Sequence, residues 1–307
     1  MRIAVMGTGA MGGYVGARLA TGGAEVSFIA RGAHLEAIRR NGLKVTSPNG
    51  DMLIRPAKAS DDPAAIGPVD LVLVAVKMYD MARAAAAVAP MIGENTSIVT
   101  LQNGVEAPDM AARLYGAART VGGVCMINAE IAGPGVIQHN ALNAVILGEL
   151  VGGVSERLRR FAGFGTRGGV EVKLSPNIRL DLWRKMMLLS PLGCLSAMIG
   201  LPFSRYHDLP ESWRLVEQGV REVAAVGRAQ GLDLGEADIE TAMHHAHNMK
   251  PTWKASLAVD RELGKRLEVE WFAGTICRLG EAAGIDTPMH SVALGVLKPH
   301  ADGAARS

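Results

Sequence analysis

The sequence has no strong charge imbalance, few cysteines and no long apolar run. Its 307 residues carry a formal net charge of +2, which is too small and too dispersed to favour nucleic acid or a membrane surface as a partner. The three cysteines form no CxxC motif, which is typical of a reducing compartment, and we expect Cys125, Cys194 and Cys277 to be buried thiols. Apolar runs such as residues 71–76 have strand length and are far too short to span a membrane. These absences favour a small-molecule partner.

The N-terminus lacks the features of a secretory signal. In MRIAVMGTGAMGG the glycines begin at residue 7, so there is no room for an apolar core and a cleavage site. We therefore expect a cytoplasmic protein. Hydrophobic residues at 49% and charged residues at 20% are ordinary globular values, and 307 residues exceed the usual size of one domain, so we expect two domains.

The first part of the chain alternates strand and helix patterns, which predicts a parallel, doubly wound sheet of the Rossmann type. Residues 136–139 and 144–147 are expected to be paired strands that extend this sheet at its edge, after a turn at residues 133–135. The other expected strands cover residues 2–6, 25–30, 70–76, 97–101 and 120–125, and the expected helices cover residues 14–21 and 80–88.

The strand pattern ends near residue 175. The following segments, over residues 178–297, are rich in alanine, leucine and methionine and are typical of long helices. The predicted fold is therefore α/β, with an N-terminal Rossmann-type NADP-binding domain, residues 1–174, followed by an all-helical domain for substrate and catalysis, residues 175–307. Breaks between the helices are expected near Pro202, Gly231, Pro251 and Gly284.

A glycine-rich turn follows the first strand and opens the first helix. A lone GxGxxG is a weak signal, but between a strand and a helix it is typical of a dinucleotide site. The first glycine permits the tight turn, the second lets the backbone approach the pyrophosphate, and the third lets helix and strand pack closely. The helix N-terminus offers N–H groups and a partial positive charge to the phosphates. The expected cofactor-binding residues of the turn are Gly7, Thr8, Gly9, Ala10, Met11 and Gly12.

Arg31 follows the second strand, where a site for NAD usually has an acidic residue. A guanidinium can bind the 2′-phosphate of NADPH through two oxygens, whereas a carboxylate would repel it. We therefore predict NADPH as the cofactor; the alternative for Arg31 is a solvated side chain. Lys77 and Asn103 also follow strands, at the edge where doubly wound sheets bind ligands, and we expect both at the cofactor. Asn-Gly is also a common turn dipeptide, so Asn103 alone does not distinguish a ligand-binding asparagine from a plain turn residue.

In combination, the motifs resemble the ketopantoate reductases, also called 2-dehydropantoate 2-reductases. The resemblance extends over nearly the whole chain and rests on GTGAMG, IAR, AVK, LQNG, GPG-x-x-x-H, LWRK, LSA and a late Ser…Asp…Glu…Gly spacing. It implies a dinucleotide-binding domain and a helical domain with the substrate between them. The implied reaction is the NADPH-dependent reduction of a 2-oxo acid to a 2-hydroxy acid, 2-dehydropantoate in the first instance, as in pantothenate biosynthesis.

The resemblance also implies roles for individual residues. The family's catalytic lysine falls on Lys185, whose ammonium would polarise the carbonyl oxygen and then protonate it as a general acid. The family's glutamate falls on Glu268, which would hold Lys185 charged or contact the cofactor. A serine that binds the substrate carboxylate falls on Ser256, and Asn103 falls on an asparagine used at both cofactor and substrate. Ala129 is a further position expected at the cofactor.

Two positions depart from the family pattern. Family members usually place asparagines four and eight residues after the lysine, on the same helix face, where they hydrogen-bond the substrate. Here those positions hold Leu189 and Gly193, and the loss of both amides should weaken ketopantoate binding. We therefore hypothesise, as an alternative, a more apolar or bulkier oxo acid or ketone that contacts Leu189, with Ser190 as a partial substitute for the asparagines.

Other features of the sequence are weaker. His244 and His247 have ligand spacing on a helix but no evident carboxylate partner, so we expect no metal site. An alternative of another class is an NADPH-binding sensor that catalyses nothing, and the retention of Lys185 and Glu268 argues against it. The sequence leaves the oligomeric state open, with a homodimer among the options.

Overall fold

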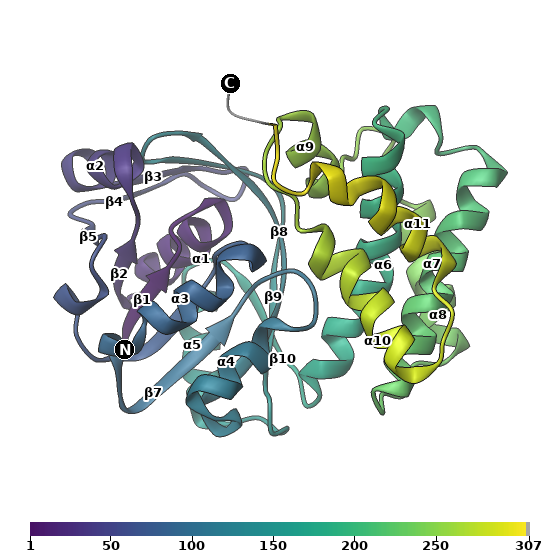
Figure 1. Cartoon of the computed structure of the whole chain (residues 1–307). Helices are drawn as coiled ribbons and strands as arrows, with labels where there is room; N and C mark the ends of the chain where they lie inside the picture. Colours follow the sequence, from purple (N-terminus) through teal and green to yellow (C-terminus); the bar gives the residue numbers. More distant parts are fainter. Residues whose placement is uncertain (305–307) are drawn as a thin grey trace. The chain divides into compact units, whose positions relative to one another are not determined.

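The structure, a computed structural model that describes residues 1–304, divides the chain into two compact units. The first unit runs from Met1 to Ile178, and the second begins at Arg179. Figure 1 shows the strands in the first unit and a group of helices in the second. The prediction of an α/β fold whose C-terminal part is helical is confirmed.

One mixed, mostly parallel sheet forms the centre of the first unit. Its strands are β1 (Arg2–Met6), β2 (Glu25–Ile29), β3 (Leu43–Thr46), β4 (Met52–Ile54), β5 (Lys58–Ser60), β6 (Val69–Val74), β7 (Ile92–Thr100), β8 (Thr120–Gly133), β9 (Val136–Glu149) and β10 (Glu171–Leu174). Their order is β4-β3-β9-β8-β7-β6-β1-β2-β5, and β10 pairs with β9. Neighbours are parallel except in the pairs β8–β9 and β3–β4.

Five α-helices connect these strands: α1 (Ala10–Thr21), α2 (Gly32–Asn41), α3 (Met81–Ala87), α4 (Ala107–Tyr115) and α5 (Glu156–Arg167). The first crossover, β1-α1-β2, follows the predicted course. It packs closely because a Cβ on Gly16 of α1 would lie 2.7 Å from the Phe28 ring of β2. Both Tyr14 and Phe28 are fully buried in the core that α1 covers.

The structure corrects the prediction of two paired edge strands at residues 136–139 and 144–147. They are two parts of one strand, β9, which pairs antiparallel with β8 and lies inside the sheet between β3 and β8. A turn at Gly135, whose φ is +73°, reverses the chain between the two strands. Shifts of register around Asn128 absorb the irregular residues opposite, so the pairing continues where the sequence pattern is broken.

The second unit is built around α6, which begins at Ile178 and ends at Ile199. Apolar residues lie on all sides of this helix, as is typical of a buried helix. The ring of Pro191 in α6 fits against Gly219 of the next long helix, where a Cβ would lie 2.8 Å from the proline Cβ. The surrounding helices are α7 (Pro210–Ala229), α8 (Glu236–His247), α9 (Ser256–Glu262), a π-helix (Glu270–Gly274), α10 (Thr275–Ala283) and α11 (Pro288–Leu297).

The cysteines agree with expectation at two positions of three. Cys125 and Cys194 are buried, and burial raises the pKa of the Cys194 thiol to about 12, which leaves it inert. Cys277 is only partly buried, and its Sγ lies 3.7 Å from the hydroxyl of Ser291, an exposed residue. The prediction of three buried thiols was therefore wrong for Cys277.

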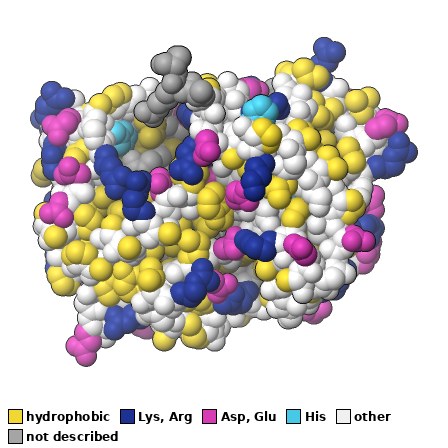
Figure 2. Space-filling model, viewed as in Figure 1, with side chains coloured by type: hydrophobic (Ala, Val, Ile, Leu, Met, Phe, Trp, Pro, Cys, Tyr) yellow, Lys and Arg dark blue, Asp and Glu magenta, His cyan; other side chains and the backbone are white. Residues whose placement is uncertain are grey.

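The surface carries both signs of charge. Figure 2 shows lysine and arginine side chains interspersed with acidic ones on the face in view, in line with the net charge of +2. Within residues 1–304, no helix is long and apolar enough to cross a membrane.

Candidate functional site

The glycine turn after β1 has a conformation that side chains would prevent. Gly7 adopts a φ of +99°, and a Cβ there would lie 2.7 Å from Val76 Cγ1. A Cβ on Gly12 would collide with the Gly7 carbonyl oxygen and lie 2.8 Å from Ala75 Cβ. A Cβ on Gly9, by contrast, would meet nothing within 4 Å. Gly7 and Gly12 are thus required by packing within the protein, whereas Gly9 leaves its backbone open to a ligand.

The N-terminus of α1 lies at the open side of the turn, next to Gly9. Gly9 is the N-cap, no side chain caps the helix, and its first turn contains no acidic residue. Thr8 is fixed beneath it, because its N–H and its hydroxyl both donate to the Ile29 carbonyl at 2.9 Å. Ala10 and Met11 open the helix, so their N–H groups belong to the first turn, which has no intrahelical acceptors. Such an end binds phosphate.

This geometry separates two alanine substitutions in the turn. Gly12→Ala should lower the free energy of unfolding by about 1–3 kcal/mol, since its methyl group overlaps backbone and Ala75. Gly9→Ala should leave the melting temperature within about 2 °C and weaken the binding of a dinucleotide instead. Thermal unfolding and a fluorescence titration with NADPH measure the two effects. Equal destabilisation by both substitutions would contradict the assignment of Gly9 to a ligand.

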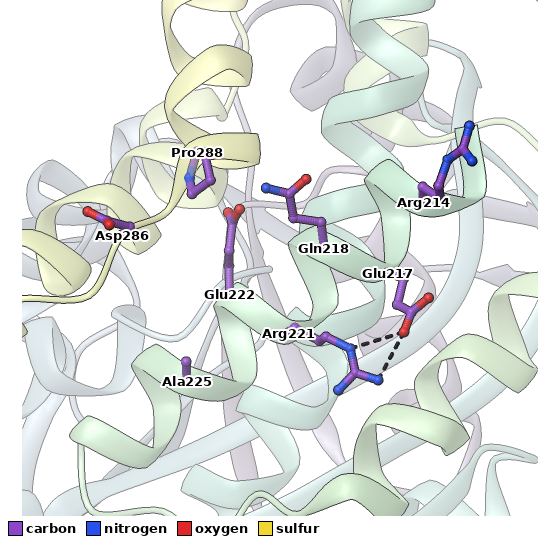
Figure 3. A pocket seen from close by; sticks show the side chains of 8 residues that line it. All are labelled: Arg214, Glu217, Gln218, Arg221, Glu222, Ala225, Asp286 and Pro288. Carbon is purple, nitrogen blue, oxygen red and sulfur yellow. Dashed lines mark hydrogen bonds and ion pairs between the residues drawn. The ribbon is translucent and has the colours of Figure 1, made fainter. Parts of the chain in front are cut away.

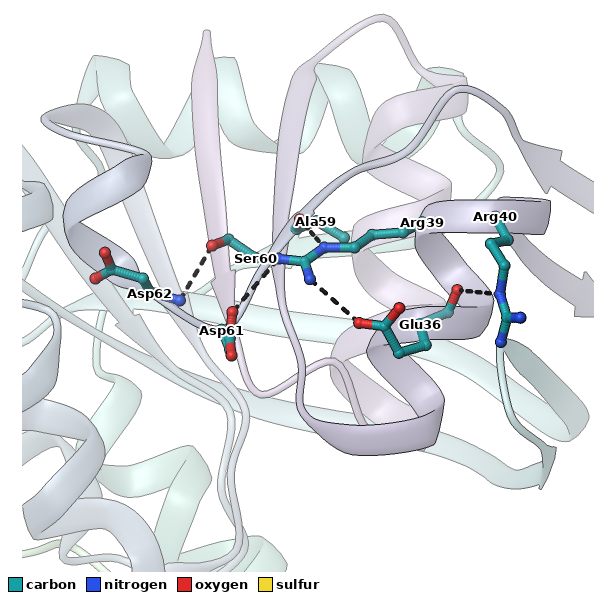
Figure 4. A network of polar contacts seen from close by, with 7 residues as sticks. All are labelled: Glu36, Arg39, Arg40, Ala59, Ser60, Asp61 and Asp62. Atoms are coloured by element: carbon teal, nitrogen blue, oxygen red, sulfur yellow. Dashed lines mark hydrogen bonds and ion pairs between the residues drawn. The ribbon is translucent and has the colours of Figure 1, made fainter.

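Arg31 lies at the end of β2 and is the N-cap of α2, where its side chain is exposed. The charge of a second arginine nearby, Arg39, is already paired with acidic side chains. Its guanidinium contacts Glu36 at 3.2 Å and Asp61 at 3.4 Å and donates to the Ala59 carbonyl at 3.2 Å, as Figure 4 shows. The geometry therefore offers Arg31 rather than Arg39 to an anion beside the glycine turn.

Lys77 and Asn103 follow the carboxyl ends of β6, which pairs with β1, and of β7, which pairs with β6. Both side chains are partly buried. Ala129 lies farther along β8, in the irregular stretch where it faces His139 of β9. Since β8 pairs with β7 only at residues 120–122, Ala129 lies on the part of β8 that extends beyond the carboxyl edge of the parallel strands.

Gln102 was not predicted from the sequence, and it tests whether this edge fits a cofactor. Its side chain is 3% exposed and its Nε2 donates to the Val74 carbonyl at 3.1 Å. Its Oε1 is buried and has no hydrogen-bond partner among residues 1–304. A buried acceptor left unpaired costs about 1–3 kcal/mol, and a ribose hydroxyl or amide N–H would satisfy it. The residues at this edge fit a dinucleotide.

His34 is a second unpredicted residue beside the turn. Its Nδ1 accepts from the Gly135 N–H at 3.0 Å, so Nε2 carries the proton of the neutral ring. Burial lowers the pKa of His34. His34 therefore joins the first turn of α2 to the turn at residues 133–135, and its buried Nε2 has no hydrogen-bond partner within residues 1–304.

In the second unit, α6 carries three of the predicted positions on one face. Lys185, Leu189 and Gly193 follow each other at spacings of four residues. Lys185 and Leu189 are partly buried and Gly193 is buried. A Cβ on Gly193 would meet nothing within 4 Å, so this face has space at the position where the sequence resemblance predicts an asparagine.

Ser190 does not share that face, which corrects its suggested role as a substitute for the asparagines. Its side chain is fully buried, and its hydroxyl is 3.0 Å from Nε2 of His290 on α11. The next residue, Pro191, packs on α7. Ser190 is thus held on the packed side of α6.

Glu268 and Ser256 come from the segment between α8 and α10. Ser256 is exposed at the first residue of α9. Glu268 is 4% exposed and lies just before the π-helix Glu270–Gly274, with its carbonyl accepting from the N–H groups of Trp271 and Phe272. π-Helices are rare and frequent at functional sites, and nothing in the sequence pattern predicted this one.

The three histidines of α8 are exposed, and one of them, His247, packs on a tryptophan. The ring of His247 lies on Trp213, with 3.8 Å between ring centroids, and Asn248 contacts His244. No group of His, Cys, Asp or Glu side chains in the described part of the chain could hold a metal ion.

Two family models match this chain. The description "Ketopantoate reductase PanE/ApbA" matches residues 3–152, and its C-terminal counterpart matches residues 177–301. A 2-dehydropantoate 2-reductase from Caulobacter vibrioides is 30% identical over 295 residues, which cover 96% of this chain and 97% of the relative. The one from Mesorhizobium japonicum is 28% identical over 97% of each chain. The crystal structure of 2-dehydropantoate 2-reductase from Geobacter metallireducens GS-15 superposes with a TM-score of 0.91 and 32% identity, over 97% of this chain and 99% of that one.

Proposed function

The chain belongs to the ketopantoate reductase PanE/ApbA family of NAD(P)-dependent oxidoreductases that act on CH–OH groups, and on this premise we propose that it reduces a 2-oxo acid with NADPH, ketopantoate in the first instance. The observation that carries the proposal is Lys185, which matches the family's catalytic lysine and lies partly buried on α6. The proposal assigns the cofactor to the first unit and the substrate chemistry to the second.

The chemistry divides between cofactor and protein. When bound, the dinucleotide would supply the hydride for the carbonyl carbon. Charge then develops on the carbonyl oxygen, and the Lys185 ammonium stabilises it by a hydrogen bond and donates the proton that completes the 2-hydroxy acid. Glu268, a buried carboxylate, is proposed to lie beside Lys185, where its charge would favour the ammonium form of the lysine and keep it ready to donate. Ser256, exposed at the start of α9, is proposed to bind the substrate carboxylate.

The finer choice of NADPH rests on Arg31. Arg31 is exposed at the N-cap of α2, beside the glycine turn, at the position where a site for NAD usually has an acidic residue, and the first turn of α2 contains no acidic residue. Helix N-termini and a guanidinium both favour the extra phosphate of NADPH.

A second candidate substrate is a more apolar 2-oxo acid. Leu189 presents a partly buried isobutyl group and Gly193 leaves open space on the Lys185 face of α6. A pocket without the two amides loses the hydrogen bonds that would select a hydroxylated substrate, and it gains apolar surface and volume.

Restoring the amides separates the two candidates. The double substitution Leu189→Asn and Gly193→Asn should raise kcat/KM for ketopantoate about tenfold relative to an apolar 2-oxo acid, because each amide adds a hydrogen bond to the substrate hydroxyl or carboxylate. NADPH consumption with both substrates measures the ratio. Leu294→Asn, a partly buried leucine of α11, is the control. If wild-type kcat/KM for ketopantoate already equals its best value on a panel of 2-oxo acids, the second candidate fails.

A further inference from the structure

Three polar side chains from three helices form a buried chain in the second unit. Glu222 of α7 is 6% exposed, and His290 of α11 and Ser190 of α6 are 0% exposed. His290 Nδ1 lies 2.6 Å from Glu222 Oε2, and its Nε2 lies 3.0 Å from the Ser190 hydroxyl. Buried polar groups are costly unless each finds a partner, and here each does.

The Glu222 end of the chain anchors α11. Its two carboxylate oxygens accept from the backbone N–H groups of Met289 and His290, at 2.8 and 3.1 Å. The N-cap Thr287 makes no side-chain capping bond, so the Glu222 carboxylate caps α11 from another helix. The positive end of the α11 dipole also stabilises the negative charge of a carboxylate placed there. Figure 3 shows Glu222 projecting from α7 toward Pro288, at the wall of a pocket of about 530 Å³.

The His290 ring continues the chain from α11 to α6. With Nδ1–H donating to Glu222, Nε2 accepts from the Ser190 hydroxyl in the neutral ring or donates to it in the charged ring. Either proton arrangement keeps the connection closed.

The order Glu–His–Ser is that of hydrolytic nucleophiles, but its burial excludes this chemistry here. A nucleophilic serine must reach a substrate carbonyl, and Ser190 is 0% exposed. The effect of the chain must therefore be on the helix that carries Ser190.

That helix needs support at this point. Pro191 has no N–H, so the Met187 carbonyl loses its intrahelical donor and the proline ring disturbs the preceding turn. Ser190, its neighbour, lies between Lys185 and Gly193 along α6. At about 1.5 Å of rise per residue, it is only about 7.5 Å along the axis from Lys185.

We propose that Glu222, His290 and Ser190 are positioning residues, which tether the interrupted segment of α6 to α7 and α11 and thereby fix the orientation of Lys185 and of the Gly193 face. The inference rests on the proposed function, because it makes the tether a determinant of proton donation by Lys185. A misplacement of about 1 Å in a reacting group can cost up to about a hundredfold in rate.

The test uses two variants of the full chain that cut the link at different atoms. His290→Asn keeps an N–H near Glu222 and removes the contact with Ser190, and Ser190→Ala removes the hydroxyl. Both should lower kcat about tenfold to a hundredfold and change the Kd for NADPH less than twofold. Ser190→Thr, which restores a hydroxyl, should recover part of the loss, and Ser291→Ala, at an exposed serine of α11, is the matched control. A lower melting temperature with unchanged kcat of the folded enzyme would show a merely structural role and overturn the proposal.

Amide hydrogen exchange of residues 186–194 gives a readout that does not depend on turnover. His290→Asn and Ser190→Ala should exchange faster there than wild type, whereas Ser291→Ala should not. If the wild-type protein reduces no 2-oxo acid, the proposed function fails, and faster exchange in the two variants would still support the tether. Unchanged exchange overturns the tether whatever the activity.

Discussion

Replacement of Lys185 by alanine should lower kcat for 2-oxo acid reduction about a thousandfold and leave the Kd for NADPH within about twofold. The loss follows from the removal of the proton donor, since general acid catalysis typically contributes about 10²- to 10⁴-fold. Lys185 belongs to α6 of the second unit, while the glycine turn belongs to the first, so the variant retains the residues proposed to hold NADPH. Stopped-flow absorbance of the nicotinamide with saturating substrate measures the step.

Two comparisons make this result specific. Lys173→Ala removes an exposed lysine that pairs with Glu171 at 3.0 Å, and it should leave kcat unchanged. Glu268→Gln keeps the shape of the buried side chain and removes its charge, and it should lower kcat less than Lys185→Ala does. Retention of more than a tenth of wild-type kcat by Lys185→Ala would refute the assignment of the proton donor.

Replacement of Arg31 by aspartate should weaken NADPH binding about a hundredfold and change NADH binding less than threefold. The variant removes a charged hydrogen bond to the 2′-phosphate, which is typically worth about 1.5–3 kcal/mol, and adds a repelling carboxylate. NADH lacks this phosphate, so its binding depends on the turn and on the strand ends. Fluorescence titrations with both cofactors measure the difference.

Arg40→Asp is the matched control, because Arg40 is an exposed arginine of the same helix that donates to the Glu36 carbonyl at 3.3 Å. It makes the same change of net charge at the other end of α2. If Arg31→Asp and Arg40→Asp weaken NADPH binding equally, a general electrostatic effect explains the result. Equal losses for NADPH and NADH in Arg31→Asp would overturn the NADPH assignment.

The beginning of the fold could be predicted because local signals agree there. β1 is a short apolar run that is buried along its length after Arg2, as expected of a strand inside a parallel sheet. Two of the glycines that follow, Gly7 and Gly12, have no room for a side chain because Val76 and Ala75 lie against them, and glycines at these positions are typical of a dinucleotide-binding turn. Sequence spacing and packing therefore carry the same information.

The long hairpin of β8 and β9 could not be predicted in the same way. Leu142 has a φ of +58°, and polar residues flank it, so the sequence around it has the character of a turn. Pairing with β8 nevertheless continues through register shifts, because the partner strand supplies the backbone hydrogen bonds. Helix α2 was not predicted because its apolar pattern is weak: only Leu35, Ala37 and Ile38 of its ten residues are buried.

The site shows the same division. Lys185, Leu189 and Gly193 could be placed on one face from their spacing alone, once the helix was recognised. Ser190, Glu222 and His290 could not be connected, because the contacts join residues 68 and 100 positions apart and no spacing rule relates three helices. The orphaned Gln102 acceptor is likewise visible only when the ends of β6 and β7 lie side by side.

The most direct test of the central claim is NADPH oxidation by the purified wild-type protein with a panel of 2-oxo acids, ketopantoate and apolar acids among them. We expect one NADPH to be consumed for each 2-hydroxy acid formed with at least one member of the panel, and a higher kcat/KM with NADPH than with NADH. NADPH binding without turnover on any 2-oxo acid would contradict the claim and would identify the protein as a dinucleotide sensor.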